Sequence, residues 1–254
     1  MSPLTNHDKR LYCLCGLPLE IDGIKIPPIT IKRIVEKGES LYNTYLMFVV
    51  ALKEAFKHIA KEIDTEELDK ISDFDLIILL SELHLDFCHQ ISEAINFFIN
   101  EKVVFNKTNK AFFVYDKDDN KIGQLDETNY SDFINIIKLQ NNCQDAIDKQ
   151  PEPTNAKIKA ALKQREEARA KLRKAKNQSE ENLTYFDYIS ILTSKSLEMD
   201  IEKCLNMTAF AFFNYMERLL MIDSYEIGIQ QLMAGAKPNQ VNLKHWFGSL
   251  QNRE

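Results

Sequence analysis

Glycine and proline are scarce in this chain, with seven of each among 254 residues. β-Sandwiches, barrels and phosphate-binding loops need many backbone positions with positive φ, which glycine supplies, so this scarcity favours a mainly helical fold. Apolar residues make up 44% of the chain and charged residues 28%, close to the averages of globular proteins. The composition therefore argues against wholesale disorder and indicates a chain that buries a core.

Long apolar runs and a disulfide framework are also missing. No stretch of about 18 apolar residues occurs, and the N-terminal sequence MSPLTNHDKR lacks the charged-then-apolar layout of a signal peptide. The five cysteines, an odd number scattered along the chain, fit reduced thiols better than disulfides. We therefore expect a soluble protein of the cytoplasm with no membrane association.

Negative charge dominates the chain, but one segment is strongly basic. The formal net charge is -6, which disfavours nucleic acid as a partner of the whole molecule. Residues 156–176 nevertheless hold nine Lys or Arg against Glu166 and Glu167, a local charge of about +7 that leaves about -13 for the remainder. This basic segment follows Pro151-Glu152-Pro153 and has few large apolar residues, so it predicts an exposed helix or linker.

The N-terminal part begins with a predicted β-hairpin. The runs 17–21 and 24–26 alternate around Asp22-Gly23, the pair that a tight hairpin turn prefers. Thr30 then stands at an N-cap position and Gly38 where a short helix would end. Apolar residues at steps of three and four predict a long helix over 39–63.

Buried helices and a second β region are predicted for the middle of the chain. A helix beginning at Ser72 or Asp73 opens two nearly continuous apolar blocks that break around Glu82. Three β-type runs follow and predict an antiparallel meander over 103–105, 111–115 and 122–125. Helical patterns resume at Asn129 or Ser131, and again from Leu183 to a short terminal helix that holds Trp246 and Phe247.

These patterns predict a mainly α fold of helical bundle-like units with a small antiparallel β component, the N-terminal hairpin and the three-stranded meander. We expect a mostly helical domain over residues 1–150, a basic exposed helix or linker over 151–182, and a C-terminal helical unit over 183–254.

No motif in the sequence specifies a reaction. The chain has no G-x-x-x-x-G-K-[ST], G-x-G-x-x-G, H-E-x-x-H or G-x-S-x-G pattern, so phosphate-binding loops, zinc hydrolysis and elbow-serine catalysis have no sequence support. We therefore assign no catalytic residue and no cofactor. Active sites assembled from residues far apart in sequence stay open at this stage.

Two sets of residues have the types of side chain that bind metal ions. Cys13 and Cys15 on one face of a strand, with His84 and Cys88 four apart on a helix, would supply four soft ligands for zinc. The first pair leaves only one residue between its cysteines where two to four are usual, and buried free cysteine behaves as a small hydrophobe. The sequence therefore favours cysteines packed in a core.

The second candidate is a calcium loop. Asp116, Asp118, Asn120 and Glu127 fall at its first, third, fifth and twelfth positions. The sixth position is Lys121, where the loop needs glycine for its sharp turn. A polar hairpin turn accounts for the same residues.

Partner binding has two candidate locations. Trp246 and Phe247 are adjacent near the C terminus, so at least one would face outward and anchor in a groove of a partner; docking of the terminal helix on its own domain is the alternative. The basic segment offers Lys163, Arg165, Arg169 and Arg173 to an acidic surface, either this protein's own or a partner's. A phosphate backbone is a further alternative, but the segment has no aromatic residue to stack on bases.

The order of features resembles a known class of proteins. It runs from Ile-Pro-Pro-Ile-Thr-Ile-Lys-Arg-Ile (26–34) and Gly38-Glu39-Ser40-Leu41-Tyr42, through the helical middle and the basic connector, to Ala234-Gly235-Ala236 and Lys244-His245-Trp246. In this it resembles the small accessory proteins in tail gene clusters of phages of Gram-positive bacteria that are described as tail assembly chaperones.

The resemblance implies a non-catalytic helical protein that binds tail-tube or tape-measure subunits in the host cytoplasm during virion morphogenesis. A structural protein of the tail or connector, and a regulatory protein that binds nucleic acid through the basic segment, are the alternatives. Homo-oligomerisation stays open.

Overall fold

The computed structural model describes residues 4–53, 55, 68, 70–143, 183–237, 241, 243 and 245–247. Over these residues the chain is mainly helical and has two small antiparallel sheets, which confirms the predicted fold class. The elements are α1 (Asn6–Leu14), β1 (Leu19–Ile21), β2 (Ile24–Ile26), α2 (Ile31–Lys37), α3 (Glu39–Val50), α6 (Asp73–Leu83), α7 (Leu85–Ile99), β3 (Lys102–Asn106), β4 (Ala111–Tyr115), β5 (Lys121–Leu125), α8 (Tyr130–Gln140), α10 (Tyr185–Lys195), α11 (Ile201–Asn206) and α12 (Ala209–Met233).

The predicted N-terminal hairpin is confirmed. β1 and β2 pair antiparallel with Ile21 opposite Ile24. The two turn residues, Asp22 and Gly23, have φ of 46° and 84°, the doubly positive geometry for which Asp-Gly is favoured. Side chains of both strands alternate between buried and exposed, so one face of the hairpin joins the core.

The predicted start of α2 is also confirmed, but the predicted length of α3 is not. Thr30 Oγ1 accepts a hydrogen bond from the backbone N–H of Arg33 at 3.3 Å, and α2 ends at Gly38 with φ of 92°. The sequence predicts one helix over 39–63, whereas α3 ends at Val50, because the backbone leaves the helical region at Ala51. Most residues from 54 to 67 lie outside the described part of the chain.

Two central helices and the meander follow. Ser72 caps α6 as predicted, and the break between α6 and α7 lies at His84 rather than around Glu82, since the backbone at His84 is extended. The three strands pair in the order β3-β4-β5, which confirms the meander. α8 begins after Asn129, one of the two predicted starting residues.

Helix α1 contradicts the predicted strand around Cys13 and Cys15. A reciprocal cap starts this helix: the Thr5 hydroxyl accepts from the backbone N–H of Asp8, and the Asp8 carboxylate accepts from the backbone N–H of Thr5. Such a capping box satisfies two amide groups at the helix start. Cys13 is consequently a buried residue of α1, whereas Cys15 is exposed at its C-cap.

The helices after residue 183 pack on the N-terminal part. The backbone N–H of Ile31 donates to the carbonyl of Met207 at 2.9 Å, and that of Ala209 donates to the carbonyl of Ile29 at 2.8 Å. Tyr185 packs edge-on against Tyr42, with ring centroids 6.1 Å apart. One buried cluster therefore includes residues of both parts, while the predicted domain boundaries stay predictions.

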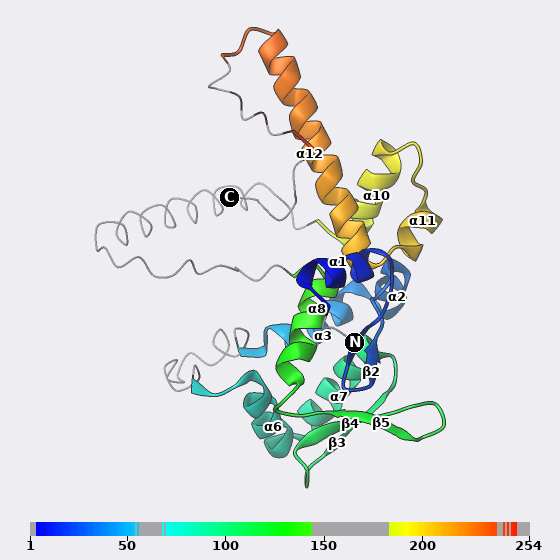
Figure 1. The fold of residues 1–254 in the computed structure, drawn as a ribbon, viewed down its shortest axis with the longest axis vertical. Coiled ribbons are helices and arrows are strands. Elements are labelled where there is room, and N and C mark those ends of the chain that lie inside the picture. Colours follow the sequence, from blue (N-terminus) through cyan, green and yellow to red (C-terminus); the bar gives the residue numbers. More distant parts are fainter. Residues whose placement is uncertain are drawn as a thin grey trace, which may run out of the picture.

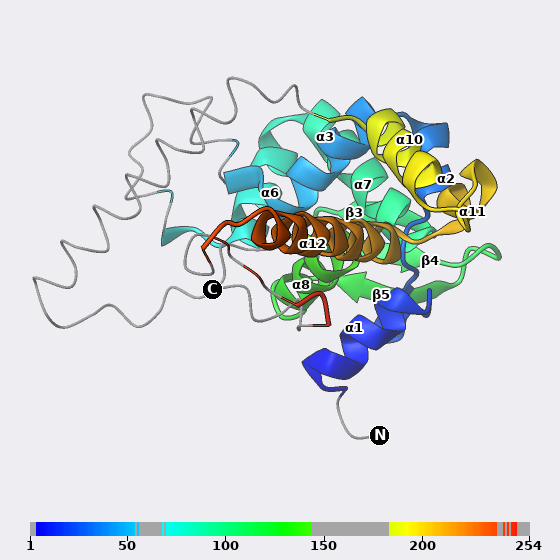
Figure 2. The same cartoon turned by 90° about the horizontal axis from the view of Figure 1, so that it is seen from above.

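The molecule is elongated, with the three-stranded sheet at one end and α12 at the other (Figure 1). Viewed from above, α12 crosses over the body, with α10 and α11 on one side and α1 on the other (Figure 2). Among the described residues, none of the helices has the length and apolar character needed to cross a membrane.

Candidate functional site

The base of α12 is anchored in the core. Thr208 caps the helix by accepting from the backbone N–H of Ala211 at 3.1 Å, and its hydroxyl also donates to the carbonyl of Cys13 at 3.1 Å. Phe210, Phe212 and Met216 are buried, so the start of this helix belongs to the core. The first two turns thus fix the direction in which the rest of the helix points.

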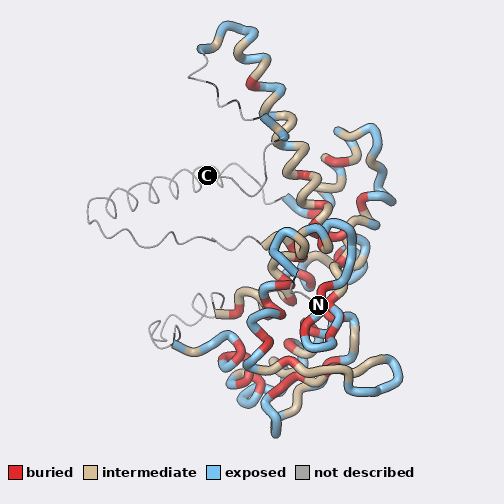
Figure 3. Tube along the Cα trace, viewed as in Figure 1, coloured by how far each residue is buried: buried red, intermediate tan, exposed pale blue. Residues whose placement is uncertain are grey.

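Beyond Met216 the helix leaves the core. In the distal half of α12, residues 217–233, Gly228 is the one buried residue. Figure 3 shows this half as half-buried and exposed, projecting from the body. Large apolar side chains are nonetheless frequent on it: Ile227 is 54% exposed and Met233 84% exposed. A helix that is apolar on several sides is normally covered, so the distal half is a candidate binding surface.

Helix α10 supports one side of α12. Lys195, in the last turn of α10, forms an ion pair with Asp223. The hydroxyls of Ser196 and Tyr215 lie 3.0 Å apart and share a hydrogen bond. These contacts hold the middle of α12 and leave its end free of α10.

Residues near the C terminus return to another side of α12. Arg218 Nη1 donates to the carbonyl oxygen of Trp246 at 2.8 Å, and the rings of Tyr225 and His245 lie 4.8 Å apart. A Cβ atom added at Gly228 would lie 2.8 Å from Leu243 Cδ1, closer than real carbon atoms approach. Glycine at this position therefore lets the returning chain pack directly on the helix.

The returning residues end in three rings, His245, Trp246 and Phe247, which we call the C-terminal aromatic cluster. The ring centroids of Trp246 and Phe247 lie 3.9 Å apart, and those of His245 and Phe247 lie 4.7 Å apart. Trp246 is half-buried, whereas Phe247 is 73% exposed. An aromatic side chain of this exposure, fixed beside an apolar helix, is a typical anchor for a protein partner.

The structure thus places two predicted site residues and leaves four unplaced. Trp246 and Phe247 lie in a turn rather than on the predicted short helix, since the chain here follows the contacts with Arg218 and Tyr225. Phe247 faces outward, as the anchor hypothesis requires, while Trp246 packs on its neighbours. The basic candidates lie outside the described residues: Lys163, Arg165, Arg169 and Arg173.

The zinc hypothesis is not supported by the positions of its ligands. Cys13 is buried in α1, and burial raises the pKa of its thiol to about 11, so this side chain is protonated at neutral pH. His84 lies at the break between α6 and α7, and Cys88 lies in the first turns of α7, so both belong to another part of the chain than α1. Within the described ranges, no three His, Cys, Asp or Glu side chains are grouped so as to hold a metal ion.

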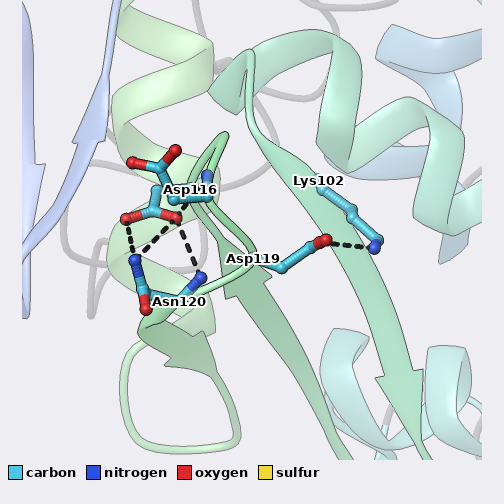
Figure 4. Close-up of polar contacts among 5 residues, drawn as sticks. Lys102, Asp116, Asp119 and Asn120 are labelled. Carbon is cyan, nitrogen blue, oxygen red and sulfur yellow. Dashed lines mark hydrogen bonds and ion pairs between the residues drawn. The ribbon is translucent and has the colours of Figure 1, made fainter.

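Residues 116–120 of the candidate calcium loop form a polar hairpin turn between β4 and β5. Asp116 Oδ1 accepts from the backbone N–H groups of Asp118 and Asn120, each at 2.9 Å, and these contacts lower the Asp116 pKa. Figure 4 shows this carboxylate facing Asn120, with Asp119 turned to Lys102 at 2.7 Å. The polar turn interpretation is therefore confirmed.

Comparison with known proteins locates a resemblance in the same region. A family model described as "YomV second domain" matches residues 174–251, which include α10, α11, α12 and the C-terminal aromatic cluster. That family is phage-associated, so this part of the chain resembles a phage protein. No curated protein and no solved structure matches the chain.

The sequence offers docking of the terminal segment on its own domain as an alternative, but it does not identify α12 as the surface on which that segment packs. One signal was available: Gly228 lies between Ile227 and Ile229 inside a long helical pattern. An isolated glycine within a helix costs stability and often marks a close approach of another segment. Which segment approaches Gly228 is determined by tertiary packing and has no local signal.

Proposed function

We propose that this protein is a non-enzymatic phage tail assembly chaperone that binds tail-tube or tape-measure subunits in the host cytoplasm. The observation that carries the proposal is the distal half of α12, a projecting helix with exposed apolar side chains beside the C-terminal aromatic cluster. The proposal assigns no catalytic residue and no cofactor. Nucleic acid and membranes are not expected as partners.

The chemistry of this surface suits a chaperone of assembly-prone subunits. Such a protein has to cover apolar surface on its client until the client assembles with other copies of the same subunit. Burying Ile227, Met233 and Phe247 would contribute about 1 to 2 kcal/mol for each side chain, before the costs of association. The three side chains together would contribute about 3 to 6 kcal/mol, so a client has to bury further surface around them to bind stably.

The comparison supports the phage context of this surface. The part of the chain that resembles a phage-associated domain, residues 174–251, contains the whole of α12 and its returning segment. The resemblance says nothing of the client. Tail-tube and tape-measure subunits are proposed from the order of sequence features described above.

Co-purification from cells that express the neighbouring phage genes tests the proposal. The tagged full chain, treated with nuclease, is expected to retain a tail-tube or tape-measure subunit. In the variant Ile227→Ser/Phe247→Ser we expect at least a tenfold loss of that subunit. The matched control is Leu83→Ser/Leu85→Ser, which removes two side chains that are each 65% exposed on other helices, and it should retain the subunit within about twofold.

Two outcomes would contradict the proposal. Equal loss in both double variants would mean that general stability, rather than the α12 surface, controls binding. Recovery of this protein in stoichiometric amounts in purified particles, measured by mass spectrometry, would show a structural virion protein instead of a chaperone.

A further inference from the structure

A second surface, remote from α12, is a cleft of about 560 Å³ beside α6. Its walls are α6, the turn between β3 and β4, and the loop between β5 and α8. Phe74, Ile78 and Leu79 give it an apolar lining. Leu79 is one of the exposed large apolar residues of the molecule, so part of this lining faces solvent.

Carboxylates surround the apolar lining. Asp75, Glu82, Asp126 and Glu127 line the cleft together with a single cation, Lys110, whose Nζ lies 3.8 Å from Glu82 Oε1. The lining residues therefore carry a net charge of about -3. Hydrogen bonds from Thr128 and Gln124 lower the Asp126 pKa, so this carboxyl group is ionised at neutral pH.

We infer that this acidic cleft binds the basic segment of the same chain, residues 156–176. The segment is the complement of the cleft in charge, with about +7 against about -3. It also carries apolar side chains at a matching spacing: Ile158 and Leu162 are four residues apart, on one face of the helix that the sequence predicts. These two side chains would lie on the apolar lining while the flanking cations meet the carboxylates.

The connecting lengths allow this contact. α8 begins two residues after Thr128 of the cleft and has 11 residues, so it carries the chain about 16 Å away from the cleft. The 12 residues from 144 to 155 can span up to about 40 Å when extended, which is enough to return. A helix of the length of the basic segment then covers about 30 Å on the way back to Leu183.

Salt-dependent proteolysis of the full chain tests the inference. Trypsin cuts after Lys and Arg, which are dense in the basic segment, and ionic strength screens exposed charges. The reference for intrinsic cleavage is a synthetic peptide of residues 151–182 in the same buffers. We expect cleavage in the full chain to be at least fivefold slower than in the peptide at 20 mM salt, and to approach the peptide rate at 500 mM salt.

A charge-neutralised cleft identifies the binding surface. In the variant Glu82→Gln/Glu127→Gln, the protection of the basic segment from trypsin at 20 mM salt should fall about two- to threefold for each lost ion pair. The control Glu198→Gln/Glu202→Gln makes the same change of charge at exposed positions near α11 and creates no trypsin site, so it should keep the protection of the wild type.

Three results would overturn the inference. Cleavage of the full chain at the peptide rate at 20 mM salt would show that the segment does not dock. Equal protection in the cleft variant and the wild type would place the docking surface elsewhere. Carboxyl-to-amine cross-links could join the basic segment to Glu82 or Glu127. If such cross-links join two chains and never lie within one chain, the cleft is occupied by the basic segment of a second copy.

Discussion

Leucine at position 228 is expected to detach the C-terminal aromatic cluster from α12. Even a Cβ atom at this position lies 2.8 Å from Leu243 Cδ1 and 3.2 Å from Val241 Cγ1, whereas ordinary carbon contacts are 3.5 to 4.0 Å. Alanine needs only a movement of the flexible end of Leu243. Leucine adds three further carbon atoms in the space that the returning chain occupies.

The magnitude follows from two opposing contributions. Overpacking of this kind costs about 1 to 3 kcal/mol. The hydrogen bond from the Arg218 guanidinium to the Trp246 carbonyl, which holds the returning chain on the helix, contributes a similar amount. Leucine in place of glycine also stabilises a helix by up to about 1 kcal/mol. The helix should therefore persist while the returning chain detaches, with the docked population of that chain reduced about 5- to 150-fold.

Fluorescence reports this change directly, because Trp246 is the only tryptophan in the chain. In Gly228→Leu we expect a red-shifted emission maximum and stronger acrylamide quenching than in the wild type, with unchanged helix content by circular dichroism. Gln230→Leu adds the same side chain at an exposed position facing away from Gly228, and its emission should match the wild type. The same emission and quenching in all three proteins would refute the packing of the chain at Gly228.

Three further predictions follow from which side chains are buried and which are exposed. Phe212→Ala should lower the free energy of unfolding in urea by about 3 to 5 kcal/mol, because Phe212 is fully buried. Phe186→Ala, at a position that is 78% exposed, should change this free energy by less than about 0.5 kcal/mol. Similar losses in the two variants would contradict the assigned burial. Iodoacetamide at pH 8 should modify exposed Cys15 well before Cys13, since the pKa of the buried thiol is about 11. The unfolding free energy should fall as pH rises from about 9 to about 11, because the Cys13 thiol ionises in the unfolded chain first. Burial also raises the pKa values of Tyr42, Tyr130 and Tyr185, which add to this fall. Cys13→Ala should therefore lose less stability than the wild type over this range, and an equal loss would refute the contribution of Cys13.

Local signals predicted the elements that local chemistry controls. Asp22-Gly23 dictates a hairpin turn through its backbone preferences, and Thr30 and Gly38 mark the two ends of α2. Helix α1 was missed because its apolar residues are few, although Thr5 and Asp8 form a capping box that is visible in the sequence. That pair indicates the start of a helix in the place where the alternation of residues predicts a strand.

Long-range contacts had no such signal. Asn129 was expected to cap α8, but its side-chain amide instead donates to Asp22 at 2.8 Å and to the carbonyl of Gln124 at 3.0 Å, which ties the meander to the hairpin. The acidic cleft likewise combines α6 with two loops that lie far apart in the sequence. Such arrangements depend on packing between segments, which periodicity within a segment does not encode.

Hydrogen exchange of the full chain, measured alone and with the proposed tail-tube or tape-measure subunit, tests whether α12 is the binding surface. We predict slower exchange on binding in the distal half of α12, residues 217–233, and around the C-terminal aromatic cluster, with little change in β3 to β5. Protection confined to other elements, with α12 unchanged in the complex, would contradict the assignment of this helix as the binding surface.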